Sequence, residues 1–202
     1  MKAIKFILLL CFSMPSWASN ESGVDISILK SKDGGVTLTY QTNKPASRIG
    51  FIRNPDNSRT SRWKPTSSDF EIVVSEEQEY LTKKDGTGFT EVSLNLTPTY
   101  KHLSKDYAPF SPYSDGGLLI YTGRLFACID RCSEEVNQWQ FSMRVPQGEH
   151  LIVGGKIYGD EAKWSDSDDG MNVYIGSQTP IETNNAIAVV DNGLPEKIKR
   201  SL

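Results

Sequence analysis

Short apolar segments that alternate with polar residues constrain the fold of this chain more than any other feature. Val24–Ile28 and Val36–Tyr40 alternate strictly, and the glycine-rich stretch Asp33–Gly35 lies between them. Alternation with a period of two is typical of strands that have one buried and one solvated face, and the stretch between them indicates a hairpin turn. Residues 89–96 repeat the alternation. Because no helical periodicity appears before residue 190, the sequence predicts an all-β fold.

The spacing of these segments predicts how the strands are organised. A longer strand is expected from Gly117 to Phe126, with Gln138–Val145 as its partner. Strands at such intervals, separated by Gly, Pro, Asn and Asp, are typical of an antiparallel β-sandwich. With 202 residues in the chain, we predict a single sandwich domain over residues 19–191.

The last residues, 192–202, have a different pattern. Pro195 suits the first turn of a helix, and Leu194, Ile198 and Leu202 fall four residues apart on one helical face. A helix of about two turns is not stable in water by itself. The segment is therefore either a frayed tail or the junction to a further, helical domain.

The N-terminal segment, residues 1–18, has the features of a secretory signal peptide. Lys2 and Lys5 form a positive start, and the apolar run Phe6–Phe12 follows. That run is far shorter than the ~20 residues that span a bilayer, so no stable membrane span is expected. Small residues near Ala18 suit cleavage after it. We therefore expect a periplasmic or secreted protein.

Cysteine usage fits an oxidising compartment. Cys11 lies within the signal segment, and Leu10 precedes it where a lipoprotein signal has a small residue, so lipidation is not expected. The remaining pair, Cys128 and Cys132, is separated by three residues, one more than a redox motif has. We predict a disulfide that clips a sharp turn; redox and metal roles remain alternatives.

Composition excludes several classes of function. The chain has 22 basic and 25 acidic residues, a formal net charge of −3, and no long basic run, so nucleic-acid binding is not expected. Its two histidines, His102 and His150, lie far apart in the sequence, and no nucleophile elbow is present. We therefore expect no catalytic set, no metal and no cofactor on this chain, with both histidines as ordinary surface residues.

A rigid aromatic loop is the best candidate for binding. Its residues are Tyr107, Phe110, Tyr113, Asp115 and Tyr121. Prolines within this stretch exclude a regular strand, and stiff aromatic loops often line ligand surfaces. The alternative is that the loop packs over one end of the sandwich.

Two charged stretches are expected in solvated loops. Asp166–Asp169 is acidic, but Met171 and Ser177 occupy the places where an EF-hand has Gly and Glu. A non-standard calcium site is the alternative for this acidic loop. Arg59–Lys64 contains three basic residues and one tryptophan, and it is expected to form a solvated basic patch.

Two segments resemble a known family. Tyr107–Gly123 is similar to part of the N-terminal β-domain of secreted zinc aminopeptidase-like proteins, the gluzincins of the aminopeptidase N and glycyl aminopeptidase type. Asn192–Ile198 is similar to the junction at which their helical catalytic domain begins. The resemblance covers residues 20–202 in layout. It implies a β-domain that packs against a peptidase domain and helps to shape access to the active site.

The metal motif of that family is absent from this sequence. Zinc is held there by His-Glu-x-x-His with a further downstream Glu, because two imidazoles one helical turn apart can bind the ion. No such motif occurs here, and no catalytic residue of the family can be assigned to this chain. The resemblance therefore implies a non-catalytic extracytoplasmic domain whose partner is a peptidase domain or another envelope protein. Such a domain would expose an apolar face near residues 194–202.

A free-standing binding module is the alternative function. It would bind a glycan, a peptide or an envelope protein through the aromatic loop, and it would have no such exposed face.

Overall fold

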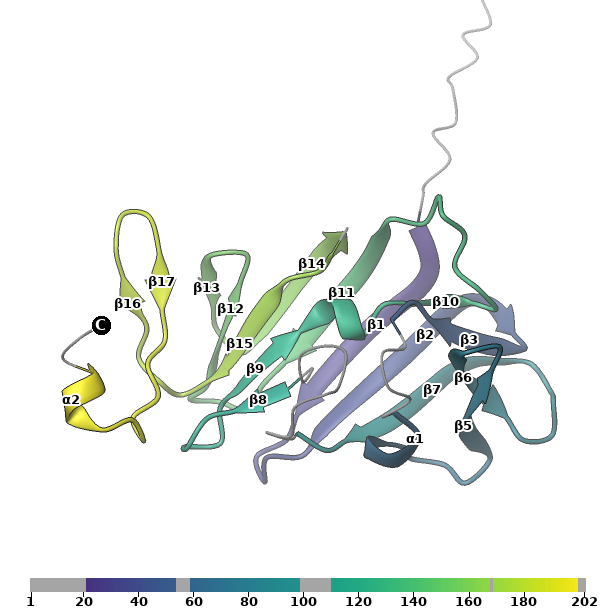
Figure 1. The fold of residues 1–202 in the computed structure, drawn as a ribbon, viewed down its shortest axis with the longest axis horizontal. Coiled ribbons are helices and arrows are strands. Elements are labelled where there is room, and N and C mark those ends of the chain that lie inside the picture. Colours follow the sequence, from purple (N-terminus) through teal and green to yellow (C-terminus); the bar gives the residue numbers. More distant parts are fainter. Residues whose placement is uncertain (1–20, 54–58, 99–109, 168, 200–202) are drawn as a thin grey trace, which may run out of the picture.

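The structure is a computed structural model that describes residues 21–53, 59–98, 110–167 and 169–199. These residues form three larger sheets and one small hairpin (Figure 1), and the all-β prediction is confirmed. The expected C-terminal helix is also present, as the single turn α2 (Glu196–Lys199). Two other short helical segments, α1 (Arg59–Arg62) and η1 (Thr122–Arg124), were not predicted.

A six-stranded sheet forms one layer of the sandwich. Its strand order is β14 (Glu161–Ser167), β11 (Gln138–Arg144), β1 (Glu21–Lys30), β2 (Val36–Ala46), β7 (Phe89–Leu96) and β4 (Trp63–Pro65). The predicted hairpin between β1 and β2 is confirmed, and Ile26 lies opposite Tyr40 in it. The pairing of β1 with β11 is parallel, which is an exception to the predicted antiparallel arrangement.

Two smaller sheets share the core with this layer. The four-stranded sheet has the order β10 (Ala127–Ile129), β3 (Arg48–Phe51), β6 (Gln78–Lys83) and β5 (Phe70–Ser75). The five-stranded sheet has the order β13 (Lys156–Tyr158), β12 (His150–Val153), β15 (Asn172–Gly176), β9 (Leu118–Tyr121) and β8 (Phe110–Pro112). The C-terminal hairpin of β16 (Ile181–Glu182) and β17 (Ile187–Ala188) follows. In Figure 1 it lies on the side of the five-stranded sheet, whereas the four-stranded sheet lies on the opposite side.

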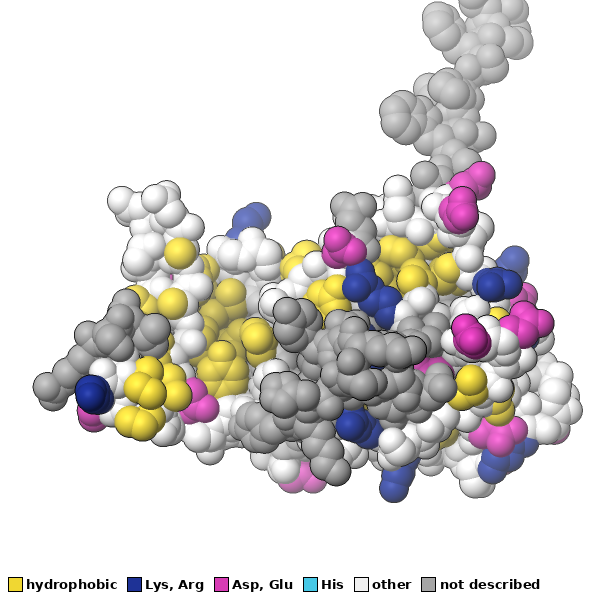
Figure 2. All heavy atoms as spheres, in the orientation of Figure 1, with side chains coloured by type: hydrophobic (Ala, Val, Ile, Leu, Met, Phe, Trp, Pro, Cys, Tyr) yellow, Lys and Arg dark blue, Asp and Glu magenta, His cyan; other side chains and the backbone are white. Residues whose placement is uncertain are grey.

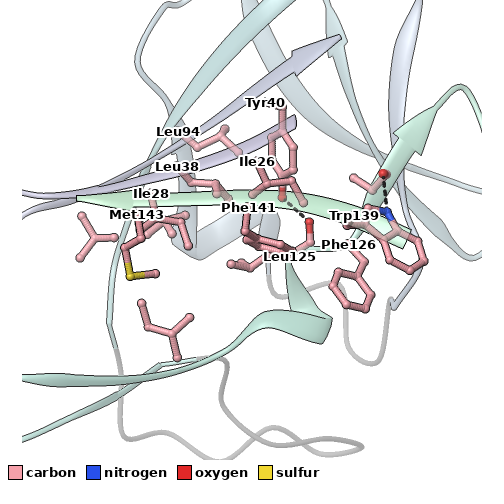
Figure 3. Packing of buried hydrophobic residues seen from close by; sticks show 14 of the residues in the cluster. Ile26, Ile28, Leu38, Tyr40, Leu94, Leu125, Phe126, Trp139, Phe141 and Met143 are labelled. Carbon is pink, nitrogen blue, oxygen red and sulfur yellow. Dashed lines mark hydrogen bonds between the residues drawn. The ribbon is translucent and has the colours of Figure 1, made fainter. Parts of the chain in front are cut away.

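The core combines side chains from all three larger sheets. Figure 3 shows the part where the six-stranded sheet packs on Leu125 and Phe126. Phe126 stacks on Trp139 with ring centres 4.1 Å apart. Buried polar groups find backbone partners: the Tyr40 hydroxyl donates to the Leu125 carbonyl at 2.9 Å, and the Trp139 indole donates to the Ala127 carbonyl at 3.0 Å. Because these polar atoms are paired, Tyr40 and Trp139 are buried without leaving their donors unsatisfied.

The predicted pairing of Gly117–Phe126 with Gln138–Val145 is wrong. The first segment leaves the sheet after Tyr121, because η1 turns the chain there. Its strand β9 pairs with β8 and β15, whereas β11 pairs with β1 and β14. Thr122 fixes the turn, because its backbone N–H donates to the Met171 carbonyl at 2.9 Å and its hydroxyl accepts from the Met171 N–H at 2.8 Å. Contacts between residues distant in sequence therefore decide this pairing.

The predicted basic patch at Arg59–Lys64 is also wrong, because its key residue is buried. The side chains of Arg59 and Glu79 have no solvent exposure, and they form an ion pair. Arg59 also donates to the Arg124 carbonyl at 2.7 Å. Its guanidinium lies 4.7 Å from the ring centre of Trp63, which is itself buried. The arginine can be buried because a carboxylate and aromatic faces surround it.

Candidate docking surface

The strands of the five-stranded sheet have apolar residues at consecutive positions. Leu118–Ile120, Leu151–Val153 and Val173–Ile175 are three such runs. Strands of this composition are typical of sheets that are covered on both faces, whereas strands with one solvated face alternate. The composition therefore indicates that both faces of this sheet are to be covered.

One face of the five-stranded sheet packs into the core. Leu118, Leu151 and Ile175 lie opposite one another across the sheet, and all three are buried. Because neighbouring residues on a strand point to opposite faces, the residues between them point away from the core.

The outer face of the same sheet has an apolar row. Strand pairing aligns Ile157, Ile152, Tyr174 and Leu119 from β13 across to β9. Ile157 is exposed, and Ile152 and Leu119 are partly exposed. A groove of about 300 Å³ continues from Leu119 toward Leu194 in the C-terminal segment. The sheet therefore has a partly uncovered apolar face that leads to the end of the described chain.

The C-terminal segment adds further exposed apolar side chains. Ile181 is 56% exposed and Ile198 is 46% exposed, values unusual for isoleucine. A second hollow of about 450 Å³ lies between the small hairpin and Lys199, and Val190 lines both this hollow and the first groove. Figure 2 shows hydrophobic atoms gathered at this end of the molecule.

We refer to these side chains together as the apolar surface. Its residues are Leu119, Ile152, Ile157, Ile181, Val190, Leu194 and Ile198. Exposed apolar side chains gathered on one face of a protein are candidates for an interaction site.

Two aspartates hold the edge of the apolar surface in place. Asp191 accepts hydrogen bonds from the Ser114 backbone N–H at 2.9 Å and from the Ser114 hydroxyl, and also from the Gly193 N–H at 2.8 Å. The Ser114 hydroxyl is the main cause that lowers the pKa of Asp191, and the Gly193 N–H contributes. These bonds fasten the C-terminal segment to the turn between β8 and β9.

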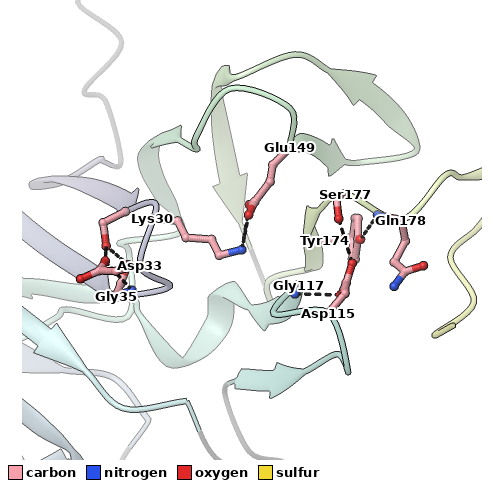
Figure 4. Close-up of polar contacts among 10 residues, drawn as sticks. Lys30, Asp33, Gly35, Asp115, Gly117, Glu149, Tyr174, Ser177 and Gln178 are labelled. Carbon is pink, nitrogen blue, oxygen red and sulfur yellow. Dashed lines mark hydrogen bonds and ion pairs between the residues drawn. The ribbon is translucent and has the colours of Figure 1, made fainter. Parts of the chain in front are cut away.

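The second aspartate, Asp115, fastens the end of β15 (Figure 4). It accepts from the Ser177 hydroxyl at 2.9 Å and from the Gly117 N–H at 3.0 Å. Burial by itself would raise the pKa of Asp115, but these hydrogen bonds to its charged form lower the pKa overall.

Tyr174 is the aromatic centre of the outer face. The Tyr113 ring contacts it edge-on at 5.1 Å, and the His150 ring lies 5.8 Å away. The Tyr174 hydroxyl accepts from the Gln178 N–H at 3.0 Å (Figure 4), and burial raises the pKa of Tyr174 to about 12. The phenol therefore stays protonated at neutral pH and serves packing.

The structure brings together only part of the predicted binding loop. Tyr113 and Asp115 lie at the edge of the apolar surface, as described above. Phe110 is buried in the core, where it has no access to a surface ligand. Tyr121 lies at the far end of β9, where its hydroxyl donates to the Asp169 carbonyl and its ring faces Arg53. Tyr107 lies outside the described residues, as does His102.

Sequence analysis did not identify Ile152, Ile157 and Leu119 as parts of a surface. The available signal was the apolar residues at consecutive positions in their strands, which we interpreted only as strand propensity. This signal would have predicted that the outer face of the sheet is apolar as well as the inner one.

The two predicted cysteines lie close together. The sulfur atoms of Cys128 and Cys132 are 1.99 Å apart, which is bonding distance. Cys128 is buried in β10, opposite Gly50 of β3, and Cys132 is in the loop toward β11. A bond here would tie the exit of a core strand to the following loop.

The acidic loop has local structural partners. Asp166 is buried and accepts from the Thr122 hydroxyl, while Asp169 pairs with Arg53 at 2.7 Å. Across residues 21–53, 59–98, 110–167 and 169–199, no cluster of three or more His, Cys, Asp or Glu side chains could hold a metal ion. In the same part of the chain, no helix is long and apolar enough to cross a membrane.

Comparison with known proteins identifies similar folds among solved structures. No protein-family model matches the sequence, and no curated protein matches it. An aminopeptidase N family protein from Idiomarina loihiensis is similar at a TM-score of 0.47 and 7% identity, over 79% of this chain and 30% of that chain. Yeast LTA4 hydrolase, solved in complex with bestatin, is similar at a TM-score of 0.39 and 12% identity, over 79% of this chain and 29% of that chain.

A third similar structure is a mutant M1 zinc metallopeptidase from Deinococcus radiodurans. Its TM-score is 0.37 and its identity 13%, over 85% of this chain and 48% of that chain. This chain therefore spans less than half the length of each of these three proteins. At such identities the likeness concerns the fold alone. Among the aminopeptidase N family structures, the matched part is the N-terminal domain rather than the catalytic part.

Proposed function

We propose that this chain is a non-catalytic, extracytoplasmic β-domain that binds a second protein domain through the apolar surface. The observation that carries the proposal is the outer face of the five-stranded sheet. Its strands have the composition of a sheet covered on both sides, yet Ile157 is exposed and Ile152 and Leu119 are partly exposed. Burial of such side chains contributes ~25 cal/mol per Å² of apolar area, so a partner that covers this face is favoured.

A zinc aminopeptidase-like domain is the proposed partner. The resemblance to that family rests on two segments, Tyr107–Gly123 and Asn192–Ile198. These segments are distant in sequence. In the structure, however, one groove is lined by Tyr113 and Leu119 from the first segment and by Leu194 from the second. The residues that carry the resemblance thus converge on the surface that we propose for docking.

The extracytoplasmic location rests on two features of different kinds. Residues 1–18 have the pattern of a signal peptide, and the Cys128 and Cys132 sulfurs are placed for a disulfide. Disulfides form and persist in the periplasm and outside the cell.

Affinity capture with matched variants tests the proposal. The purified chain is used as bait in the extracytoplasmic fraction of its source cells, and retained metallopeptidases are identified by mass spectrometry and by aminopeptidase assay. We expect the native chain to retain such a peptidase and Ile198→Glu to lose it, because a carboxylate would have to be buried in an apolar interface. Leu29→Glu is the matched control, since Leu29 is 48% exposed but lies on the six-stranded sheet, outside the apolar surface.

Equal retention by native chain and Ile198→Glu would contradict docking through the apolar surface. Retention of other proteins, with no peptidase among them, would contradict the proposed partner class.

A free-standing binding module is the second candidate function. The groove of about 300 Å³ favours it, because Tyr113 and Pro112 line this groove with Leu119 and thereby give it a stiff aromatic wall. Thermal-shift screening with neutral glycans and short apolar peptides tests this function, since a ligand that binds the folded state raises its melting temperature. We expect Tyr113→Ala to abolish any such rise.

A further inference from the structure

The edges of the three larger sheets differ in how well they are protected from pairing with another chain. Strand edges present unpaired N–H and C=O groups, and proteins protect them by short length, proline or charged side chains. Four edge strands in the described part of the molecule have only three residues: β4, β8, β10 and β13. Two of these contain a proline, Pro65 in β4 and Pro112 in β8. The seven-residue edge β14 has exposed, charged Glu161 and Lys163.

Strand β5 is the exception among these edges. It has six residues with the sequence Phe-Glu-Ile-Val-Val-Ser, which contains no proline and no lysine. Its β-branched residues favour the strand conformation, and Val74 is 45% exposed. β5 pairs with β6 on one side, and no backbone hydrogen bond joins Ile72 or Val74 to any other described residue.

The direction of the free backbone groups follows from the hairpin between β5 and β6. Glu76 and Glu77 both have positive φ and form a two-residue turn, so Ser75 and Gln78 close the ladder as a hydrogen-bonded pair. At the other end the Lys84 N–H donates to the Asp69 carbonyl at 2.8 Å. Odd-numbered residues of β5 therefore bond toward β6, because hydrogen-bonded pairs alternate along an antiparallel ladder.

The even-numbered residues consequently present their backbone groups to the edge that faces away from β6. The N–H and C=O groups of Ile72 and Val74 point outward, together with the C=O of Phe70. The Phe70 N–H donates to the Ser67 carbonyl at 3.3 Å. The free groups thus form a short ladder whose midpoint is Ile72.

We propose that β5 pairs antiparallel with β5 of a second copy of this chain, about a two-fold axis at Ile72. Ile72 would exchange both backbone hydrogen bonds with the same residue of the second copy. Val74 N–H would donate to the Phe70 carbonyl of the second copy, and the reciprocal bond would form by symmetry. The two four-stranded sheets would then join into one continuous sheet.

A second copy fits this edge because the strand is complementary to itself. In the register centred on Ile72, Phe70 lies opposite Val74, so the apolar face continues across the dimer axis. The charged Glu71 lies opposite the neutral Val73, so no like charges face each other directly. Two-fold pairing uses the same patch on both copies and closes after two chains. In Figure 1, β5 lies on the opposite side of the molecule from the C-terminal hairpin, so the dimer leaves the apolar surface open.

Sedimentation velocity over a concentration series tests the proposal with the matched variants Val74→Pro and Val74→Ala. Proline removes the outward N–H without touching the ladder to β6, and edge strands tolerate it where the N–H faces solvent. We expect the native chain and Val74→Ala to form a dimer. Val74→Pro should raise the dissociation constant about thirtyfold, because each copy loses one hydrogen bond. Equal melting temperatures of the two variants establish that both are folded.

Three outcomes would overturn the proposal. The first outcome is that the native chain remains monomeric into the high micromolar range. The second is that folded Val74→Pro dimerises as tightly as Val74→Ala. The third outcome is a dimer that Ile198→Glu abolishes and Val74→Pro does not, because self-association would then use the apolar surface.

Discussion

The buried ion pair between Arg59 and Glu79 allows the sharpest test of the packing argument. Both side chains are fully buried, and Glu79 accepts from the Arg59 guanidinium and from the Arg59 backbone N–H at 3.1 Å. Glu79→Ala would leave the guanidinium buried without its carboxylate. Removal of one partner of a buried pair costs ~3–5 kcal/mol.

Contacts that survive the substitution place the expected loss at the lower end of this range. Arg59 keeps its hydrogen bond to the Arg124 carbonyl and its position 4.3 Å above the ring centre of Phe51. We therefore expect Glu79→Ala to lower the free energy of unfolding by ~3 kcal/mol. For a domain of this size the melting temperature should fall by about 6–12 °C.

Urea unfolding followed by tryptophan fluorescence measures this loss. Glu161→Ala is the matched control, because its ion pair with Arg144 has side chains that are 45% and 67% exposed. An exposed pair is worth at most about 1 kcal/mol. The double variant Arg59→Met with Glu79→Leu should recover most of the loss, since apolar replacement of a buried pair is often neutral. A loss in Glu79→Ala no larger than in Glu161→Ala would refute the reasoning.

Two further predictions concern the cysteine pair and the anchor of the C-terminal segment. The double variant Cys128→Ser, Cys132→Ser should lower the free energy of unfolding by roughly 1–3 kcal/mol, near the low end because the closed loop is short. Equal melting temperatures of the native chain in reducing and oxidising buffer would argue against a disulfide. The pKa of Asp191 is lowered in the folded protein by the Ser114 hydroxyl. The contribution of Asp191 to stability is therefore present above the pKa of about 3.9 that aspartate has in the unfolded chain. It is lost as the pH falls through the lower pKa of the folded state. The Ser114 amide resonance should therefore shift in NMR spectra recorded below pH 4, and Asp191→Asn should abolish this shift. If the Ser114 resonance shifts with pH in the variant as it does in the native chain, the Asp191 anchor is ruled out.

Strand content was predictable from the sequence because it depends on neighbouring residues. The hairpin of β1 and β2 is defined by alternation in two segments and by the turn at Asp33–Gly35. The single helical turn that begins at Glu196 follows Pro195, which suits the first turn of a helix. In each case the signal lies within a few residues of the structure that it specifies.

Pairing and burial were not predictable in the same way. β1 pairs with β11, which lies more than a hundred residues away in the sequence. Neither segment contains a sequence signal that specifies the other as its partner. Arg59 appeared to be a surface residue because its carboxylate partner, Glu79, is twenty positions away on a different element. The candidate site shows the same division: Tyr113 and Asp115 were identified, whereas Phe110 proved to be buried.

The sequence by itself determined that this protein is all-β and that a short helix follows Pro195. Alternation and turn residues are local properties, so they are present in the chain before it folds. The tertiary structure alone decided which strands are neighbours, which charges are buried and which apolar faces remain open. These properties depend on contacts between distant segments: Leu119 and Leu194 line one groove only after the chain has folded.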